Sequence, residues 1–177
     1  MIIVIVDYGM GNLRSVQSKI EMLKFGSVVS SDPRDILKAD KLILPGVGFF
    51  GEAMKNIRER GLLEALNTRV ITDKKPILGI CLGMQLLTLH SEEGDAEGLK
   101  WIDGHVRRFN FTQRDNMLRI PHVGWNTIKK HEDCILFRDI PDGTRFYFTH
   151  SYCVTCDVDS EAAAFTEYGY QFASVVH

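Results

Sequence analysis

The stretch of sequence that decides the fold is Pro76-Ile-Leu-Gly-Ile-Cys-Leu-Gly-Met-Gln-Leu-Leu87. An apolar run typical of a strand enters a Gly-x-Cys-x-Gly turn, and a helical pattern leaves it. This order predicts a nucleophile elbow, a tight strand-to-helix turn that lifts one side chain clear of a sheet. Gly79 and Gly83 flank the turn because a Cβ at either position would collide with the neighbouring strand or helix. The sequence therefore predicts that Cys81 is a nucleophile.

The chemistry expected of Cys81 is acyl transfer. At a helix N-terminus, unpaired amides and the macrodipole favour the thiolate over the thiol. The amide of Leu82 would point toward an oxyanion formed at the attacked carbonyl. The alternative is a small buried side chain without chemistry, as most free cysteines are. The two glycines, the apolar strand before them and Gln85 after them favour the nucleophile.

Strand and helix patterns alternate from the N-terminus to the elbow, which predicts βαβ units and a parallel sheet. Residues 2–6 are continuously apolar, as a strand buried on both faces is. Asn12 is a candidate N-cap for a helix ending near Phe25-Gly26. The remaining expected elements are a short strand at 27–30, a turn at Asp32-Pro33, a strand at 41–44 and a helix over 53–66 that Gly61 weakens.

The pattern changes after about residue 100. Four segments with short connections are typical of strands, at 101–111, 118–130, 145–154 and 162–176. We therefore expect one α/β domain over residues 1–177, with a largely parallel central sheet, flanking helices and added antiparallel strands.

Two glycine loops follow strands in the first half. Pro45-Gly-Val-Gly48 allows a backbone amide to face a neighbouring site without side-chain obstruction, so it could supply a second oxyanion donor beside Leu82. A plain strand-ending turn is the alternative. Gly9-x-Gly11 invites a dinucleotide-binding reading, but Arg14 stands where the third fingerprint glycine belongs.

Composition excludes several classes of protein. The chain is 45% hydrophobic and 25% charged with a net charge of −2, which gives no indication of nucleic acid or an anionic membrane as partner. The apolar start lacks the basic leader of a signal peptide, and no run approaches the roughly 20 apolar residues of a spanning helix. Cys153 and Cys156 form a Cys-x-x-Cys, but residues three apart on a strand point to opposite faces and no second ligand pair completes a zinc site. We expect a cytoplasmic protein without metal or cofactor.

Four segments together resemble the class I, triad-type glutamine amidotransferases, whose fold is flavodoxin-like. More narrowly, they resemble the glutaminase subunits of imidazole glycerol phosphate synthase, an enzyme of histidine biosynthesis. The elbow marks the wider class, and the first and last segments mark the subunit. The segments are Asp7-Tyr-Gly-Met-Gly-Asn-Leu-Arg-Ser15, Leu44-Pro-Gly-Val-Gly48, Gly79-Ile-Cys-Leu-Gly-Met-Gln-Leu-Leu87 and Pro121-His-Val-Gly-Trp-Asn126.

The resemblance implies a role for each matching position. Cys81 would attack the side-chain amide of glutamine, and a thioester would form, release ammonia and be hydrolysed to glutamate. Val47 and Leu82 would give the oxyanion amides, with Gly46 in the same hole, and Val47 would need a loop rearrangement to present its amide. Glutamine would be held by Gln85 and by the backbone of His150, Ser151 and Tyr152. Trp125 and Asn126 would face a (β/α)₈ cyclase subunit that uses the ammonia.

Two of these assignments have a plainer alternative. Trp125 considered alone would belong to a core, and His150 in an aromatic strand would be a hydrogen-bonded strand histidine rather than a catalytic base.

The sequence also departs from the family pattern. The family's catalytic His and Glu lie in a Gly-x-Gln-Phe-His-Pro-Glu-Lys-Ser segment, which these 177 residues do not contain. The ending at Tyr170-Gln-Phe-Ala-Ser-Val-Val-His177 resembles the strand that precedes that segment, so His177 is not the missing base. We expect the closing strand and helix to be missing, and the chain as written to be inactive or nearly so as a glutaminase.

Three rival functions remain open at this point. A paralogous subunit would supply ammonia for sugar amination in surface-polysaccharide assembly, and its sequence over these residues would be nearly the same. A degenerate amidotransferase domain would serve as a binding module, which the missing triad members favour and the intact elbow opposes. A peptide hydrolase of the same superfamily has no support, because Pro121-His-Val-Gly-Trp-Asn126 matches the synthase subunit.

Overall fold

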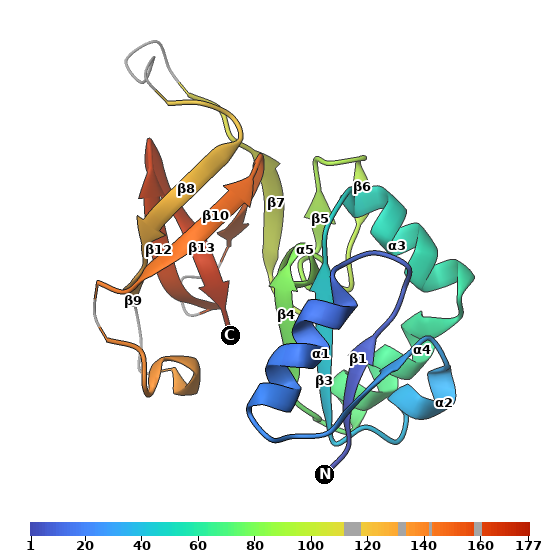
Figure 1. Ribbon diagram of the computed structural model, residues 1–177. Helices are drawn as coiled ribbons and strands as arrows, with labels where there is room; N and C mark the ends of the chain where they lie inside the picture. The colour runs from blue at the N-terminus through green and yellow to red at the C-terminus, as the bar shows by residue number, and fades with distance from the viewer. Residues whose placement is uncertain (112–117, 131–133, 142, 158–160) are drawn as a thin grey trace.

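The computed structural model describes residues 1–111, 118–130, 134–141, 143–157 and 161–177 (Figure 1). Its first half holds β1 (Ile3–Val6), α1 (Leu13–Met22), β2 (Ser27–Ser30), α2 (Pro33–Ile36), β3 (Lys41–Gly46), α3 (Phe50–Glu59), α4 (Leu62–Asn67), a π-helical turn η1 (Thr68–Thr72), β4 (Ile77–Cys81) and α5 (Leu82–Gln85). The second half holds β5 (His90–Ser91), β6 (Ala96–Glu97), β7 (Gly104–Arg108), β8 (His122–Thr127), β9 (Lys129–Lys130), η3 (Ile135–Phe137), β10 (Arg145–His150), β11 (Tyr152–Cys156), β12 (Ala162–Tyr168) and β13 (Tyr170–Val176).

The first half is built around a parallel sheet in the order β2-β1-β3-β4. All four residues of β1 are buried, as the continuous apolar run predicts. Side chains of Ile3, Ile5 and Ile43 meet α1 on one face. The alternate residues Val4 and Leu44 meet the other helices on the opposite face. The sheet is thus covered on both sides, which confirms the predicted α/β architecture.

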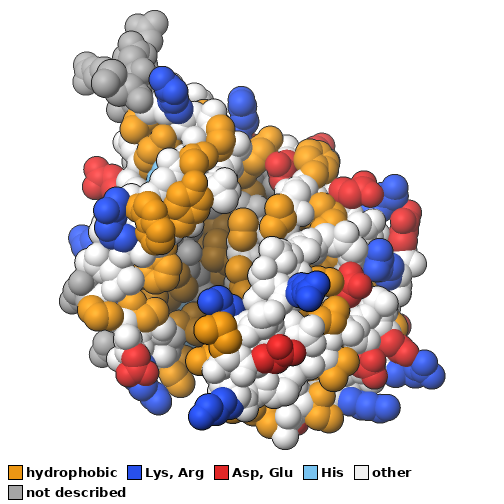
Figure 2. All heavy atoms as spheres, in the orientation of Figure 1, with side chains coloured by type: hydrophobic (Ala, Val, Ile, Leu, Met, Phe, Trp, Pro, Cys, Tyr) orange, Lys and Arg blue, Asp and Glu red, His pale blue; other side chains and the backbone are white. Residues whose placement is uncertain are grey.

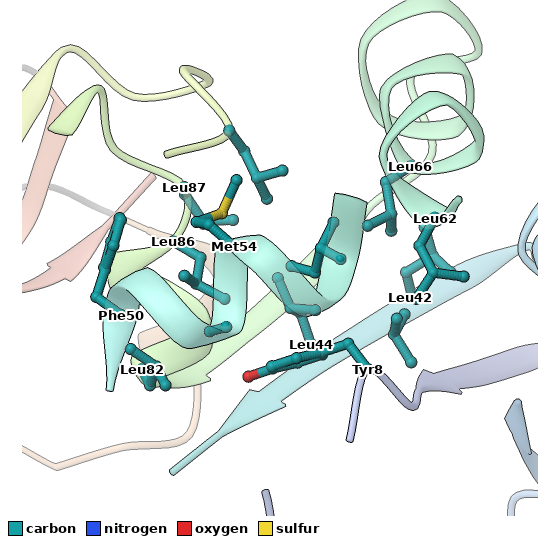
Figure 3. Packing of buried hydrophobic residues seen from close by; sticks show 14 of the residues in the cluster. Tyr8, Leu42, Leu44, Phe50, Met54, Leu62, Leu66, Leu82, Leu86 and Leu87 are labelled. Carbon is teal, nitrogen blue, oxygen red and sulfur yellow. The ribbon is translucent and has the colours of Figure 1, made fainter. Parts of the chain in front are cut away.

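The main core joins α3 to the elbow. Phe50 and Met54 of α3 face Leu82, Leu86 and Leu87 in and after α5 (Figure 3). This packing ties the short elbow helix to a long one, because four residues alone cannot make a stable helix.

The second half is mostly antiparallel, with one parallel pair between β5 and β7, and it is divided into more strands than the sequence suggests. A seven-stranded mixed sheet runs in the order β6-β5-β7-β11-β13-β12-β9, and β10 pairs with β8 as a separate two-stranded sheet. The expected strand at 145–154 is two strands, β10 and β11, and that at 162–176 is a hairpin, β12–β13, turning at Gly169 with a φ of +74°.

Three helix predictions need correction. The expected helix over 53–66 is two helices, because Gly61 adopts a φ of +68° between α3 and α4. Asp32-Pro33 is not a plain turn, since Asp32 accepts a bond from the Arg34 amide and caps the short helix α2. The first helix ends at Met22 rather than near Phe25, although Asn12 is its N-cap as predicted, accepting from Ser15 N at 3.2 Å.

The strand β4 is the outer strand of the parallel sheet, and it is poorly covered. Leu78 is 42% exposed and Ile80 is 37% exposed. Figure 2 shows apolar side chains gathered in the hollow between the two halves of the molecule. Over the described part of the chain, no helix is both long and apolar enough to cross a membrane.

Candidate active site

The turn at Cys81 has the backbone geometry of a nucleophile elbow. Cys81 ends β4 and precedes α5 with φ 56° and ψ −118°, a conformation that non-glycine residues rarely adopt. A Cβ on Gly79 would lie 2.7 Å from the Met84 Cα, and one on Gly83 would overlap the carbonyl oxygen of Leu44. The predicted reason for both glycines is therefore confirmed.

The thiol of Cys81 is accessible but is not a stabilised thiolate. The residue as a whole is exposed. Partial burial raises the pKa of the Cys81 thiol above its usual value, and the hydrogen bond from the Leu82 amide opposes this only in part. The helix-terminal amide of Leu82 thus favours the thiolate, as predicted, but desolvation outweighs it and the net shift of the Cys81 pKa is upward. A four-residue helix carries too small a dipole to outweigh desolvation.

The glycine loop after β3 lies directly beside the elbow. Gly46 pairs with Cys81 in the β3–β4 register. A Cβ on Gly46 would lie 2.8 Å from the Gly83 nitrogen and would overlap the Tyr8 hydroxyl. Val47 follows at once and is 64% exposed. The sheet therefore brings Gly46, Val47 and Leu82 to the same edge as Cys81.

Tyr8 is a residue of this site that the sequence analysis did not assign. It is fully buried among the core side chains (Figure 3). Its hydroxyl donates to the Pro45 carbonyl at 2.8 Å. Burial, and then the nearby Cys81, raise the pKa of Tyr8, so the hydroxyl stays protonated as a donor. Its position two residues after the end of β1 was the available signal, because strand ends meet at one edge of a parallel sheet.

Two of the residues expected to hold glutamine, Gln85 and Tyr152, are in contact although they lie 67 positions apart in the sequence. Gln85 Nε2 donates to the Tyr152 carbonyl at 3.0 Å, and His150 Nδ1 lies 2.8 Å from the same oxygen. The Ser151 carbonyl accepts from Phe109 N at 3.0 Å. His150 is thus a hydrogen-bonded strand histidine, as the plainer alternative held.

Trp125 and Asn126 lie on opposite faces of β8. Trp125 is 60% exposed and packs edge-on against Tyr147, with ring centroids 5.7 Å apart. Asn126 is half-buried, and its amide donates to the Glu167 carbonyl at 3.0 Å. Trp125 is therefore a surface residue rather than a core residue, while the side chain of Asn126 is used inside the molecule.

The Cys-x-x-Cys pair lies in one strand. Cys153 is buried in β11 and Cys156 is half-buried at its end, and residues three apart on a strand point to opposite faces. Burial raises the pKa of Cys153 to about 11. Within the described ranges, no group of three or more His, Cys, Asp or Glu side chains is placed to hold a metal ion.

Comparison with known proteins places this geometry in a family. The chain matches the family model "Glutamine amidotransferase class-I" over residues 4–177. A crystal structure of a glutamine amidotransferase superimposes with a TM-score of 0.69 at 15% identity, over 98% of this chain and 89% of that one. A glutamine amidotransferase from Thermotoga maritima gives a TM-score of 0.64 at 17% identity, over 97% of this chain and 69% of that one. The chain belongs to the class I glutamine amidotransferases.

Curated relatives narrow the family further. Imidazole glycerol phosphate synthase subunit HisH of Sulfurimonas denitrificans is 46% identical over 177 aligned residues, covering 98% of this chain and 84% of the relative. Subunit HisH 2 of Methanococcus maripaludis is 44% identical over 174 residues, covering 98% of this chain and 85% of the relative. Within its class, the chain belongs to the HisH family of imidazole glycerol phosphate synthase subunits.

Proposed function

We propose that this chain is the glutamine-hydrolysing half of a cytoplasmic, two-component imidazole glycerol phosphate synthase. The names of its relatives support the choice of this enzyme. The geometry around Cys81 supports the hydrolysis of glutamine. The partner would be a (β/α)₈ cyclase subunit, bound as a heterodimer, that consumes the ammonia.

The proposed reaction proceeds through a thioester on Cys81. The sulfur of Cys81 attacks the side-chain carbonyl carbon of glutamine, and the resulting oxyanion accepts bonds from the amides of Leu82 and Val47. The C–N bond then breaks, the leaving nitrogen takes up the proton that the Cys81 thiol has lost, and ammonia departs from a glutamyl thioester. Water adds to the thioester, which releases glutamate and restores the thiol.

One observation carries this proposal. Cys81 has a positive φ at the junction of β4 and α5, with the Leu82 amide bonded to its sulfur and Gly46 paired beside it. Backbone strain of this kind costs about 1–3 kcal/mol and persists where the surrounding structure enforces it, commonly at active sites. A cysteine with a purely structural role would gain nothing from this strained backbone conformation.

The exposed face of β8 and β10 supports a docking role. Val123, Trp125 and Tyr147 are each more than half exposed, and the strand register puts them on one face. Trp and Tyr are the residues most enriched among binding hot spots. We propose that this face, centred on Trp125, contacts the cyclase, and that Asn126 supports the strand from behind.

We also propose that residues 1–177 alone hydrolyse glutamine slowly. Among the described residues, no histidine is bonded to the Cys81 thiol, and both ring nitrogens of His150 are engaged elsewhere. The raised pKa of Cys81 leaves most of the thiol protonated at neutral pH. An enzyme lacking a triad member typically retains only about 10³–10⁴ over water, from binding and the oxyanion hole.

Ammonia release from labelled glutamine, with the cyclase present, tests the function. We expect a slow rate that Cys81→Ala abolishes and that Cys134→Ala, at a buried cysteine in a separate cluster, leaves unchanged. A rate that survives Cys81→Ala would refute the nucleophile. A rate near the common enzymatic range of about 1–10³ per second would refute only the proposal of slow turnover.

A further inference from the structure

Two histidines are bonded to each other inside the second half of the molecule. His122 of β8 and His150 of β10 are direct partners in the strand register, and His122 Nδ1 lies 3.0 Å from His150 Nε2. His122 is only 3% exposed. Its ring is sandwiched between Phe148 and Tyr168, with centroids 4.9 Å and 3.9 Å away. Such a pair is costly to bury unless every ring nitrogen has a partner.

A chain of hydrogen bonds runs from the Tyr152 carbonyl through His150 and His122 to Asn126. The positions of the imidazole hydrogens follow from the Tyr152 end of this chain. The Tyr152 carbonyl only accepts, so His150 Nδ1, 2.8 Å away, carries the hydrogen. A neutral His150 then accepts at Nε2, and His122 Nδ1 must donate to it. His122 Nε2 is left as an acceptor.

The other end of the chain gives the same answer independently. Asn126 accepts at Oδ1 from Thr127 N at 2.8 Å, so its Nδ2 is the donor, and it donates to the Glu167 carbonyl. The same Nδ2 lies 3.4 Å from His122 Nε2, which must therefore accept. Both histidines are neutral with the hydrogen on Nδ1. Burial lowers the pKa of both imidazoles, which agrees with this state.

The chain of bonds ends at the candidate glutamine site. The Tyr152 carbonyl accepts from both His150 Nδ1 and Gln85 Nε2, at 2.8 Å and 3.0 Å. Both lone pairs of this oxygen are thereby used, so it holds Gln85 rather than the substrate. Because Nε2 of Gln85 is fixed as the donor, its Oε1 remains an acceptor, and no donor from the described residues fills it. A carbonyl oxygen of this kind suits an ammonium group.

We propose that His122 and His150 are positioning residues that fix the Tyr152 carbonyl, so that Gln85 presents Oε1 to the α-ammonium of glutamine. This inference rests on the proposed function, since it assumes that glutamine binds beside Cys81. The histidines do not touch the substrate. They set the orientation of the group that does.

The test compares two alkylating probes at Cys81. A diazoketone analogue of glutamine reads both recognition of the amino-acid group and thiol reactivity, whereas iodoacetamide reads thiol reactivity alone. The variant His122→Leu removes the donor to His150. We expect the ratio of analogue rate to iodoacetamide rate to fall about five- to tenfold, the worth of one or two net hydrogen bonds. The loss should lie in the analogue's half-saturating concentration rather than in its limiting rate.

A conservative variant separates positioning from packing. His122→Asn places an amide N–H near the position of Nδ1–H, so it should restore the ratio to within about threefold. His90→Gln, at an exposed histidine that pairs with Asp95, is the control and should leave the ratio unchanged. An unchanged ratio in His122→Leu, or an equal loss in His122→Asn, would overturn the inference. If excess glutamine fails to slow the analogue on the unmodified protein, the proposed function fails first and this inference falls with it.

A measurement on the unmodified protein covers the case in which His122→Leu does not fold. Imidazole nitrogen chemical shifts at neutral pH should show Nδ1–H for both His122 and His150. An Nε2–H tautomer on either ring would reverse the chain of donors and contradict the inference.

Discussion

At the scale of single residues, the backbone conformation at Cys81 is possible only because Gly83 and Gly46 have no Cβ atom. The positive φ of Cys81 brings α5 so close to β3 that Gly83 packs on the Leu44 carbonyl. Gly46, the last residue of β3, also packs closely on Tyr8 and Leu82. The elbow is thus held by close backbone contacts rather than by its four-residue helix.

Gly83→Ala should be strongly destabilising, because the added methyl group overlaps a backbone oxygen that cannot move away cheaply. We expect the free energy of unfolding to fall by about 2–4 kcal/mol in a denaturant titration. Gly26→Ala is the matched control, since a Cβ there meets nothing within 4 Å. Equal effects of the two substitutions would contradict the packing argument.

Tyr8→Phe should cost stability through one hydrogen bond. The change removes the hydroxyl that donates to the Pro45 carbonyl beside the elbow, and that hydrogen bond is lost. We expect a loss of about 1–2 kcal/mol in the free energy of unfolding. Tyr147→Phe, at a tyrosine that is 56% exposed, should change it by less than about 0.5 kcal/mol. A silent Tyr8→Phe would remove this hydroxyl from the account of the oxyanion loop.

At the scale of elements, the two faces of β8 have different roles: one forms an exposed surface and the other contacts the aromatic core. Trp125 and Val123 face outward with Tyr147, while His122 and Asn126 face the aromatic core. Alternation along a strand is what allows one segment to carry a surface patch and a buried polar chain.

Trp125→Ala should weaken binding to the cyclase far more than it weakens folding. We expect the dissociation constant to rise at least about tenfold, as for a hot-spot residue, with a change in unfolding free energy below about 1 kcal/mol. Val28→Ala on β2, where the side chain is 50% exposed, is the control and should bind normally. Calorimetric titration with the cyclase checks both, and unchanged binding by Trp125→Ala would refute the docking face.

Sequence patterns predicted the first half of the molecule well, because β1 and the start of β3 are apolar runs, and turns or glycine loops follow the strands. They failed at the helix boundaries, where single residues decide: Gly61 breaks a helix through its positive φ, and Asp32 starts one as a cap. The two-residue strands β5 and β6 leave no periodicity to detect.

In the candidate site too, local sequence patterns identified some residues, whereas others depend on tertiary contacts. The motif located Cys81, Gln85 and the glycine loop, since each is tied to a local turn or helix. The sign of the Cys81 pKa shift was missed because desolvation depends on surrounding tertiary structure. His122 belongs to the segment Pro121–Asn126, in which the sequence indicates roles only for Trp125 and Asn126. Its role follows from its contact with His150, 28 positions away.

At the scale of the whole molecule, stability should be highest between about pH 6.5 and 9. Burial, and then His150, lower the pKa of His122 from 6.5 to about 4 in the folded chain. The unfolded chain therefore binds a proton first, and the free energy of unfolding falls as pH drops from 6.5 toward 4. On the alkaline side, burial raises the pKa of Cys153 from 9.0 to about 11, so stability falls again over that interval.

Chemical unfolding across pH tests this curve. His122→Asn removes the titrating ring and should flatten the acid limb relative to His90→Gln. An acid limb equally steep in both variants would assign it to other groups.

The central claim is that Cys81 is the nucleophile of a glutamine site, and covalent labelling tests it most directly. The protein is treated with the diazoketone analogue of glutamine at mildly alkaline pH, and the labelled peptide is found by mass spectrometry. The account predicts one label per chain on Cys81, slowed by excess glutamine, with none on the other three cysteines. Labelling of Cys134, Cys153 or Cys156 instead, or labelling of Cys81 that glutamine does not slow, would contradict it.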